Sequence, residues 1–312
     1  MSLYLFFDVG NTRLKWAAVE SNQNPSAQQK KLWAYSGSIS SKSLQSAEHR
    51  EELADYIAKT LPKPDAIGFS CVAGDEAITN LKSLFPQWSD LHWQQLKGDS
   101  TFSGMRSLYQ DASKLGADRW AALIGARALS TNNTLVVNAG TATTIDLLGS
   151  NGVHYGGWIL PGLGLMQESL QSKTAQLPLA IREESQQEFG STTNEAIIGG
   201  CDAAQIGAIH YALLQAKKLN HPVERIWLDG GNAKVLLAQI KNLTCRIGRL
   251  NKLRAWYFAA FGRGYYKIFK SESCPVGLWW SAHTKTVWQL PYRPSFLLDE
   301  SLLRYRFHNL RP

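Results

Sequence analysis

The sequence predicts an α/β fold built from two similar halves that face one cleft. Residues 3–19 and residues 135–146 share one plan: an apolar strand, Asp or Asn, a glycine turn with hydroxyl residues, and a second apolar run. A third glycine turn, at residues 229–233, follows another apolar strand and opens a helix. Two such hairpins far apart in the chain indicate a duplicated domain.

In the first hairpin, Asp8 ends the strand and is followed by Gly10, Asn11 and Thr12. Glycine lets a phosphate approach the backbone, N–H groups and a hydroxyl can donate to phosphate oxygens, and a carboxylate can hold a hydrated cation. An ordinary N-terminal hairpin explains this pattern equally well by itself. The second copy at residues 135–146 favours phosphate binding.

The other segments follow the periodicities of strands and helices. After the first hairpin we expect a strand at 32–35, a helix at 43–60, a strand at 66–73, a helix at 77–85, a weak strand at 88–96 and a helix at 119–129. This order resembles a ribonuclease-H-like half of the actin/sugar-kinase type, which periodicity alone does not identify. The second half continues with a strand at 156–162 and helices at 163–173 and 196–217, the latter preceded by Thr192 and Glu195 at capping-box spacing. Gly199 and Gly200 inside that helix suggest close packing against another element.

Asp118 and Arg119 stand together at the start of the predicted helix 119–129. A carboxylate at a helix N-terminus is favoured by capping and by the helix dipole, which explains a single acid there. It does not explain an Asp-Arg pair after Gly116 and Ala117. Such a pair places a proton acceptor beside a group that can receive a carboxylate.

Length and composition set the broad class. A chain of 312 residues allows two domains with ample core. The N-terminus reaches Asp8 without a basic segment, no run approaches the ~20 apolar residues of a membrane span, and the four cysteines are scattered. We therefore expect a reduced cytoplasmic protein without a signal peptide, a membrane segment or a structural zinc ion.

The positive charge is confined to the end of the chain. Residues 246–312 hold twelve Lys and Arg against three acids, whereas the whole chain has a net charge of +8, so residues 1–245 are close to neutral. This end is also rich in aromatic residues. Basic residues interleaved with aromatics suit nucleic acid, but an irregular extension or a non-homologous, frame-shifted end explains the segment as well, and the abrupt change of composition favours the last.

Six short motifs occur in an order and spacing that resembles the type III pantothenate kinases, a group that includes Bvg accessory factor homologues. They are Asp8-Val9-Gly10-Asn11-Thr12, Gly116-Ala117-Asp118-Arg119, Gly140-Thr141-Ala142-Thr143, Gly156-Gly157-x-Ile159-x-Pro161-Gly162, Gly190-x-x-Thr193-x-Glu195-Ala196-Ile197 and Gly230-Gly231-Asn232-Ala233. The resemblance implies ATP-dependent phosphorylation of pantothenate to 4'-phosphopantothenate, the first step of coenzyme A synthesis. It also implies a duplicated fold of the actin type, a homodimer with a shared active site, Mg²⁺, and a monovalent cation, K⁺ or NH₄⁺.

The resemblance also implies residue roles. Asp118 is the general base, and Asp8 holds the magnesium–phosphate unit. Binding of ATP and its phosphates is implied for Gly10, Asn11, Thr12, Lys15, Gly140, Thr141, Thr143, Gly230 and Gly231. Binding of pantothenate is implied for Tyr109, Gly116, Ala117 and Arg119, which receives the carboxylate, and for Thr193 of the partner subunit. The chain has no P-loop motif, so phosphate binding depends on these turns.

Two features depart from the family pattern. Asn138 occupies the position of an aspartate that helps to ligate the monovalent cation, so one negative charge is missing there. After Leu243 the family expects a short strand and a closing helix, and the sequence shows neither. We therefore divide the chain into two ribonuclease-H-like domains, residues 1–117 and 118–245, and a tail, residues 246–312.

Two other functions compete with the kinase. A catalytically impaired homologue could act as a regulatory protein that binds nucleic acid through the basic tail. A ribonuclease-H-type nuclease needs several clustered carboxylates for two metal ions, and only Asp8 suits that role well, with Asp146 and Asp229 as weaker candidates.

Overall fold

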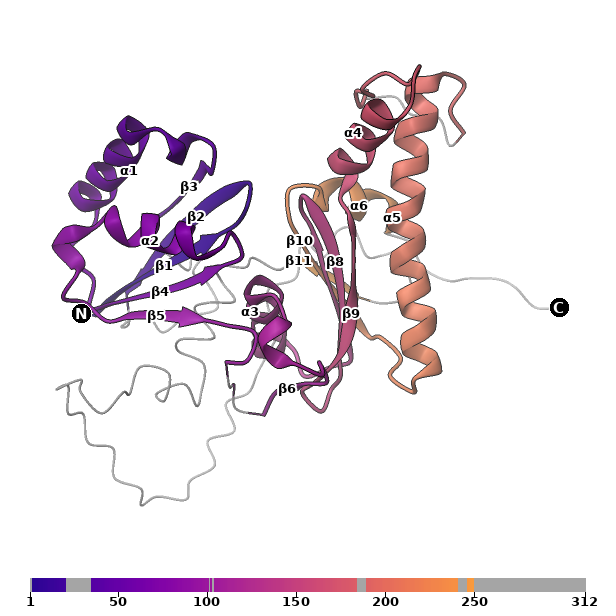
Figure 1. Cartoon of the computed structure of the whole chain (residues 1–312). Helices are drawn as coiled ribbons and strands as arrows, with labels where there is room; N and C mark the ends of the chain where they lie inside the picture. Colours follow the sequence, from indigo (N-terminus) through magenta and orange to yellow (C-terminus); the bar gives the residue numbers. More distant parts are fainter. Residues whose placement is uncertain are drawn as a thin grey trace, which may run out of the picture.

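The computed structural model describes residues 2–20, 35–100, 102, 104–183, 189–240 and 246–249. These residues form two mixed β-sheets with helices against them (Figure 1). Most of the basic tail, including residues 250–312, lies outside the described residues, as do residues 32–34 of the strand predicted at 32–35.

The first sheet has the strand order β3-β2-β1-β4-β5. β1 and β2 form the first hairpin, β2 pairs antiparallel with β3, and β4 and β5 add parallel strands on the other side of β1. The bounds are β1 Leu3–Val9, β2 Arg13–Glu20, β3 Tyr35–Ser40, α1 Ala47–Thr60, β4 Ala66–Cys71, α2 Asp75–Ser83 and β5 Trp93–Leu96, with short 3-10 turns at Ser43–Gln45 and Pro86–Trp88. The predicted order of elements is confirmed, and the third strand is described from Tyr35 to Ser40.

The second sheet has the order β11-β10-β7-β8-β9-β6. Its strands are β6 Arg106–Ser107, β7 Thr134–Ala139, β8 Ala142–Leu148, β9 Val153–Pro161, β10 Arg225–Asp229 and β11 Arg246–Arg249. Its helices are α3 Ala117–Leu129, α4 Leu163–Lys173, α5 Thr193–Lys218 and α6 Ala233–Ile240, with a 3-10 turn at Ala112–Lys114. The predicted capping box opens α5, because Thr192 and Glu195 exchange both hydrogen bonds.

The duplication is visible in the strand orders. β9-β8-β7-β10-β11 repeats β3-β2-β1-β4-β5, so β7 corresponds to β1 and β11 to β5. β11 pairs in parallel with β10 from Arg246 to Arg249, which means that the predicted tail begins with a strand of the second sheet. A single apolar residue, Ile247, in a four-residue strand gives too little periodicity to reveal it in the sequence.

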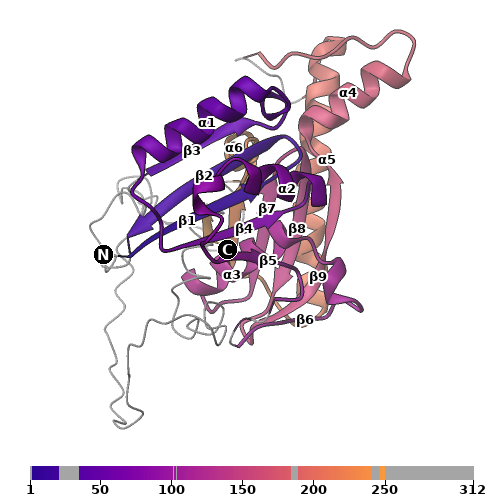
Figure 2. The same cartoon turned by 60° about the vertical axis from the view of Figure 1, so that its left-hand side comes forward.

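Helix α3 lies between the two sheets and packs against β4 of the first and against β7 and β8 of the second (Figures 1 and 2). A shared core joins α3 residues such as Trp120 and Leu123 to Phe6 of β1 and Val136 of β7. Two further cores cover the outer faces, one beneath α1 and α2 and one beneath α4, α5 and α6. Because side chains alternate along a strand, Asp8 and Asn138 both lie on the inner faces, two residues beyond Phe6 and Val136.

Two predictions of organisation need comment. β6 lies before the predicted domain boundary at residue 118 but belongs to the second sheet, and α3 contacts both halves. Helix α5 is, by length and composition, the one described helix that could cross a membrane, although core helices meet the same criteria. It packs on the outer face of the second sheet through Ile198, Ile209 and other buried residues.

Candidate active site

The tips of the two predicted phosphate turns meet. Thr12 Oγ1 lies 2.7 Å from Thr141 Oγ1, so a hydroxyl from each hairpin reaches the same point although the residues belong to different sheets. Both threonines are exposed. Each turn is closed by its glycine N–H, Gly10 donating to Arg13 O and Gly140 to Ala142 O, both at 3.1 Å. The sequence-based expectation that the two hairpins face each other agrees with this contact.

The third glycine turn supports the second hairpin. Asn232 donates from its backbone N–H to Ala139 O at 3.0 Å and from Nδ2 to Gly140 O at 3.3 Å. Gly230 has a φ of 104°, and a Cβ at this position would collide with the backbone of Ala139. Only glycine combines this backbone conformation with such a close approach. Gly231 follows at the start of α6, with open space where a Cβ would stand.

Asp8 is a nearly buried carboxylate at the end of β1, only 7% exposed. Ser70, its neighbour on β4, donates a 3.0 Å hydrogen bond to Asp8 Oδ1. Lys15 is its cross-strand neighbour on β2. The site therefore combines a carboxylate, a cation and a hydroxyl donor beside the first glycine turn, and Ser70 is a member that sequence reasoning missed.

At the corresponding place in the second half, Asn138 pairs in register with Asp229 of β10 and with Thr144 of β8. Strands in a sheet lie about 4.8 Å apart, so the Asp229 carboxylate stands beside the Asn138 amide. Thr143, in contrast, is 1% exposed and shares the outer face of β8 with Ile145. Thr141 and Thr144, not the Thr143 side chain, are the threonines of this hairpin that face the space between the sheets.

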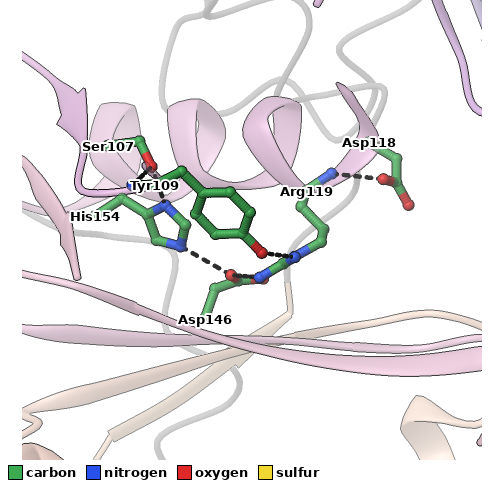
Figure 3. Close-up of polar contacts among 6 residues, drawn as sticks. All are labelled: Ser107, Tyr109, Asp118, Arg119, Asp146 and His154. Atoms are coloured by element: carbon green, nitrogen blue, oxygen red, sulfur yellow. Dashed lines mark hydrogen bonds and ion pairs between the residues drawn. The ribbon is translucent and has the colours of Figure 1, made fainter. Parts of the chain in front are cut away.

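Asp118 and Arg119 lie in the first turn of α3 (Figure 3). Asp118 is half-buried, and its Oδ1 accepts a 2.8 Å hydrogen bond from the backbone N–H of Arg119. A Cβ added at Gly116 would lie 2.8 Å from the same Oδ1 of Asp118, so any side chain at position 116 would crowd the carboxylate. Ala117 is buried and faces the core.

Arg119 turns inward and is 4% exposed. Its Nε donates to Asp146 Oδ2 at 3.0 Å and its Nη2 to Asp146 Oδ1 at 2.5 Å, a bidentate ion pair that joins α3 to β8. Nη1 donates to the hydroxyl of Tyr109 at 2.6 Å. Three of the five guanidinium N–H groups thus donate to the protein. Asp146 therefore holds one side of Arg119, the residue that we expect to receive a substrate carboxylate.

The surroundings of Arg119 favour its charged form. Burial opposes the charge on Arg119, but the hydrogen bonds and the negative charge of Asp146 outweigh it, so the pKa of Arg119 is raised above its ordinary value. A guanidinium of such high pKa stays charged throughout the stable range of the protein. Removing Asp146 would leave this charge buried without a partner.

Two residues that sequence reasoning missed extend the cluster. His154 Nε2 lies 2.9 Å from Asp146 Oδ1, and His154 Nδ1 lies 2.8 Å from Ser107 Oγ (Figure 3). His154 is completely buried. Asp146 could be found in the sequence as a lone acid in an apolar strand, whereas nothing local marks His154 or Ser107.

Thr193 is not part of this cluster. It is the exposed first residue of α5, which covers the outer face of the second sheet, whereas α3 with Asp118 covers the inner face. Among the described residues, no three His, Cys, Asp or Glu side chains gather in a metal-binding group.

Two half-domains that meet through facing glycine turns, with a helix between their sheets, have the fold of the actin/sugar-kinase type. A solved structure of a candidate 2-dehydro-3-deoxygalactonokinase from Sinorhizobium meliloti is similar in fold, with a TM-score of 0.50 and 11% sequence identity over 82% of this chain and 98% of that chain.

The sequence comparisons narrow the class to one family. The model of the type III pantothenate kinase family matches residues 4–215. A type III pantothenate kinase of Herminiimonas arsenicoxydans is 35% identical over 257 residues, which cover 80% of this chain and 94% of the relative. Another, from Aromatoleum aromaticum, is 36% identical over 75% of this chain and 88% of the relative. This chain belongs to the type III pantothenate kinase family, and it is a kinase.

Proposed function

We propose that this chain transfers the γ-phosphoryl group of ATP to the primary hydroxyl of pantothenate, yielding 4'-phosphopantothenate and ADP in the first step of coenzyme A synthesis. The observation that carries the proposal is the contact of Thr12 with Thr141, which makes one phosphate-binding site from both halves. Membership of the family supplies the substrate.

Asp118 acts as the general base in this proposal. As the hydroxyl oxygen of pantothenate forms its bond to the γ-phosphorus, the bond between that phosphorus and the β,γ-bridging oxygen breaks, and the hydroxyl proton passes to the Asp118 carboxylate. Phosphoryl transfer depends mainly on positioning and on neutralising charge, so an oriented carboxylate suffices. The hydrogen bond from the Arg119 backbone N–H to Asp118 Oδ1 orients it.

Arg119 and Tyr109 hold the other end of pantothenate. Their side chains are joined at 2.6 Å, and the Arg119 guanidinium retains two N–H groups beyond those that donate to Asp146 and Tyr109. These can donate to a carboxylate while Asp146 keeps the guanidinium in place. Gly116 keeps the approach to Asp118 open.

The phosphates of ATP lie between the glycine turns, with Gly10, Asn11, Thr12 and Lys15 on one side and Gly140 and Thr141 on the other. Gly230 and Gly231 lie at the nucleotide side of the cleft. Asp8 suits Mg²⁺ held through water or phosphate, because Mg²⁺ keeps much of its hydration shell and takes one or two carboxylates. Asp8 offers one carboxylate already oriented by Ser70.

The monovalent cation is assigned to Asn138 together with Asp229. The Asn138 amide oxygen can coordinate K⁺ or NH₄⁺, and Asp229 stands beside it in register on β10. The charge that is missing at position 138 is therefore present on the neighbouring strand.

A coupled assay of ADP release tests the function. We expect ADP release by the purified chain to require both pantothenate and Mg²⁺, and to rise when Na⁺ is replaced by K⁺ or NH₄⁺. Mass spectrometry should show one phosphate added to pantothenate. ATP turnover of equal rate without pantothenate would contradict the proposal.

The chain acts as a homodimer in this proposal. Exposed residues of α5 at helical spacing form an apolar stripe: Gly200, Ala203, Ala204, Gly207, Tyr211 and Leu214. Among the described residues, a Cβ at Gly199, Gly200 or Gly207 would meet no atom within 4 Å, so the expected close packing is not made inside one chain. A second copy supplies it, and Thr193, which lies on the wrong face to serve its own site, then serves the site of the partner.

Tyr211 is the side chain to change. It is 55% exposed and stacks on Trp158 of β9 at a centroid distance of 5.5 Å. Tyr211→Glu places a charge in the stripe and is expected to shift the protein from dimer to monomer in sedimentation, with loss of pantothenate phosphorylation. Tyr56→Glu on α1 is the matched control, because Tyr56 is 56% exposed and far from the stripe. A dimeric Tyr211→Glu protein with full activity would refute the interface.

We retain the expected cytoplasmic location as part of the proposal. It agrees with the kinase function of the chain and with the use of α5 as a core and dimer helix.

A further inference from the structure

We infer that His154 is a positioning residue for pantothenate, because it closes a ring of hydrogen bonds that fixes Arg119 and Tyr109 together. This inference rests on the proposed function of these two side chains. It adds His154 of β9 to the residues that hold the substrate.

The ring begins and ends at Tyr109. The Tyr109 backbone N–H donates to Ser107 Oγ at 3.2 Å, and Ser107 Oγ contacts His154 Nδ1 at 2.8 Å. His154 Nε2 then contacts Asp146 Oδ1, Asp146 accepts both hydrogen bonds of the ion pair from Arg119, and Arg119 Nη1 returns to the hydroxyl of Tyr109. The His154 ring also stacks on the Tyr109 ring at 5.7 Å with an angle of 17° between planes.

The contacts determine which ring nitrogen of His154 donates to Asp146. The Asp146 carboxylate that pairs with Arg119 can only accept, so His154 Nε2 must carry the proton. Where Nε2 alone carries a proton, Nδ1 accepts from the Ser107 hydroxyl, which in turn accepts from the Tyr109 N–H. Every polar atom named in the ring has a partner, which is the condition under which a buried polar network holds one geometry.

A backbone irregularity puts His154 into the ring. β8 and β9 pair as Asp146 with Gly157, but two residues later the register slips by one, so that Leu148 faces His154. A slip of one residue turns a side chain to the opposite face of the sheet. His154 therefore shares the inner face with Asp146, while Tyr155 packs in the outer core. Gly156 at this bulge has a φ of 106°, a conformation suited to glycine.

Gly157 completes the arrangement. A Cβ on Gly157 would collide with Asp146 Oδ1 and with the carbonyl oxygen of Ile145, and would lie 2.8 Å from Arg119 Nη2. In the motif Gly156-Gly157, the first glycine allows the bulge that orients His154, and the second leaves the space that the ion pair occupies.

His154→Phe tests the inference, because Phe keeps the ring that stacks on Tyr109 but removes both hydrogen bonds. Without these bonds the Asp146 carboxylate holds the Arg119 guanidinium less firmly in the position that receives the substrate carboxylate. We expect KM for pantothenate to rise about tenfold, with KM for ATP unchanged. Ser107→Ala, which removes one link of the ring and is easier to accommodate, is expected to raise KM for pantothenate about threefold. His49→Phe at an exposed position of α1 is the control and should change neither constant.

Nitrogen-15 NMR of the histidine side chains provides a readout that needs no activity. The signal that disappears in His154→Phe should belong in the wild type to a ring protonated at Nε2. A ring without a proton at Nε2 would overturn the inference, as would equal changes in both Michaelis constants or an unchanged pantothenate constant in both variants. If the wild type shows no pantothenate-dependent turnover, the proposed function fails, whereas the NMR result still decides whether the ring exists.

Discussion

Asp118→Asn is expected to abolish most of the kinase activity while leaving the fold intact. Loss of a general base lowers kcat by about 10²–10⁴-fold, because the hydroxyl proton then has no acceptor as the new bond forms. The Asn side-chain oxygen can still accept the hydrogen bond that the Arg119 backbone donates to position 118. The start of α3 therefore keeps its geometry, and binding of both substrates should change little.

The measurement is steady-state ADP release, together with the thermal midpoint of unfolding. Asp111→Asn is a suitable control, since the Asp111 side chain likewise accepts a hydrogen bond from a nearby backbone N–H, that of Ser113, and lies outside the cluster of Figure 3. Its pKa is lowered by hydrogen bonds from Ser113, which shows that it too is an oriented carboxylate. If Asp118→Asn kept more than a tenth of the wild-type kcat, Asp118 would not be the base.

Asp146→Asn is expected to produce the largest loss of stability. The substitution preserves shape but leaves the Arg119 charge, in a side chain only 4% exposed, without its counter-ion. Breaking a buried ion pair in this way costs about 3–5 kcal/mol of the free energy of unfolding. Because α3 packs between the sheets and Asp146 lies on β8, we expect the substitution to weaken the packing that joins the two halves.

Asp202→Asn is the matched control. Asp202 is also buried and also forms a bidentate pair, with Arg182, but the Arg182 side chain is 32% exposed. Its charge can turn toward water when the partner is lost, so we expect a cost of only about 1–2 kcal/mol. Urea unfolding at one protein concentration measures both. Equal losses in the two variants would show that burial of Arg119 does not set the energy of its pair.

The order of elements could be read from the sequence because each depends on local signals. Helix α1 follows from apolar spacing ended by prolines, and α5 from the capping box of Thr192 and Glu195, which the structure confirms. The glycine turns were visible for a similar reason: Gly230 needs a positive φ and contact with the backbone of Ala139, and no other residue type satisfies both.

The site was only partly predictable. Four candidate residues could be recognised in the sequence because they stand in motifs of characteristic residue types: Asp8, Thr12, Thr141 and Asp118. The partner of Arg119 could not be recognised in this way, because the packing of α3 on β8 brings Asp146 to it. The same holds for Ser70, which reaches Asp8 through the parallel pairing of β1 and β4.

The sequence by itself determined which segments are strands and helices, where the backbone needs glycine, and that two halves share one plan. Only the tertiary structure decided which side chains meet across those segments. β11 became the counterpart of β5 through pairing with β10, and His154 joined Asp146 through a one-residue slip between β8 and β9. The physical reason is that periodicity records the face a side chain takes relative to its neighbours in the chain, whereas strand pairing and helix docking set which faces are opposed, and these depend on residues far away in sequence.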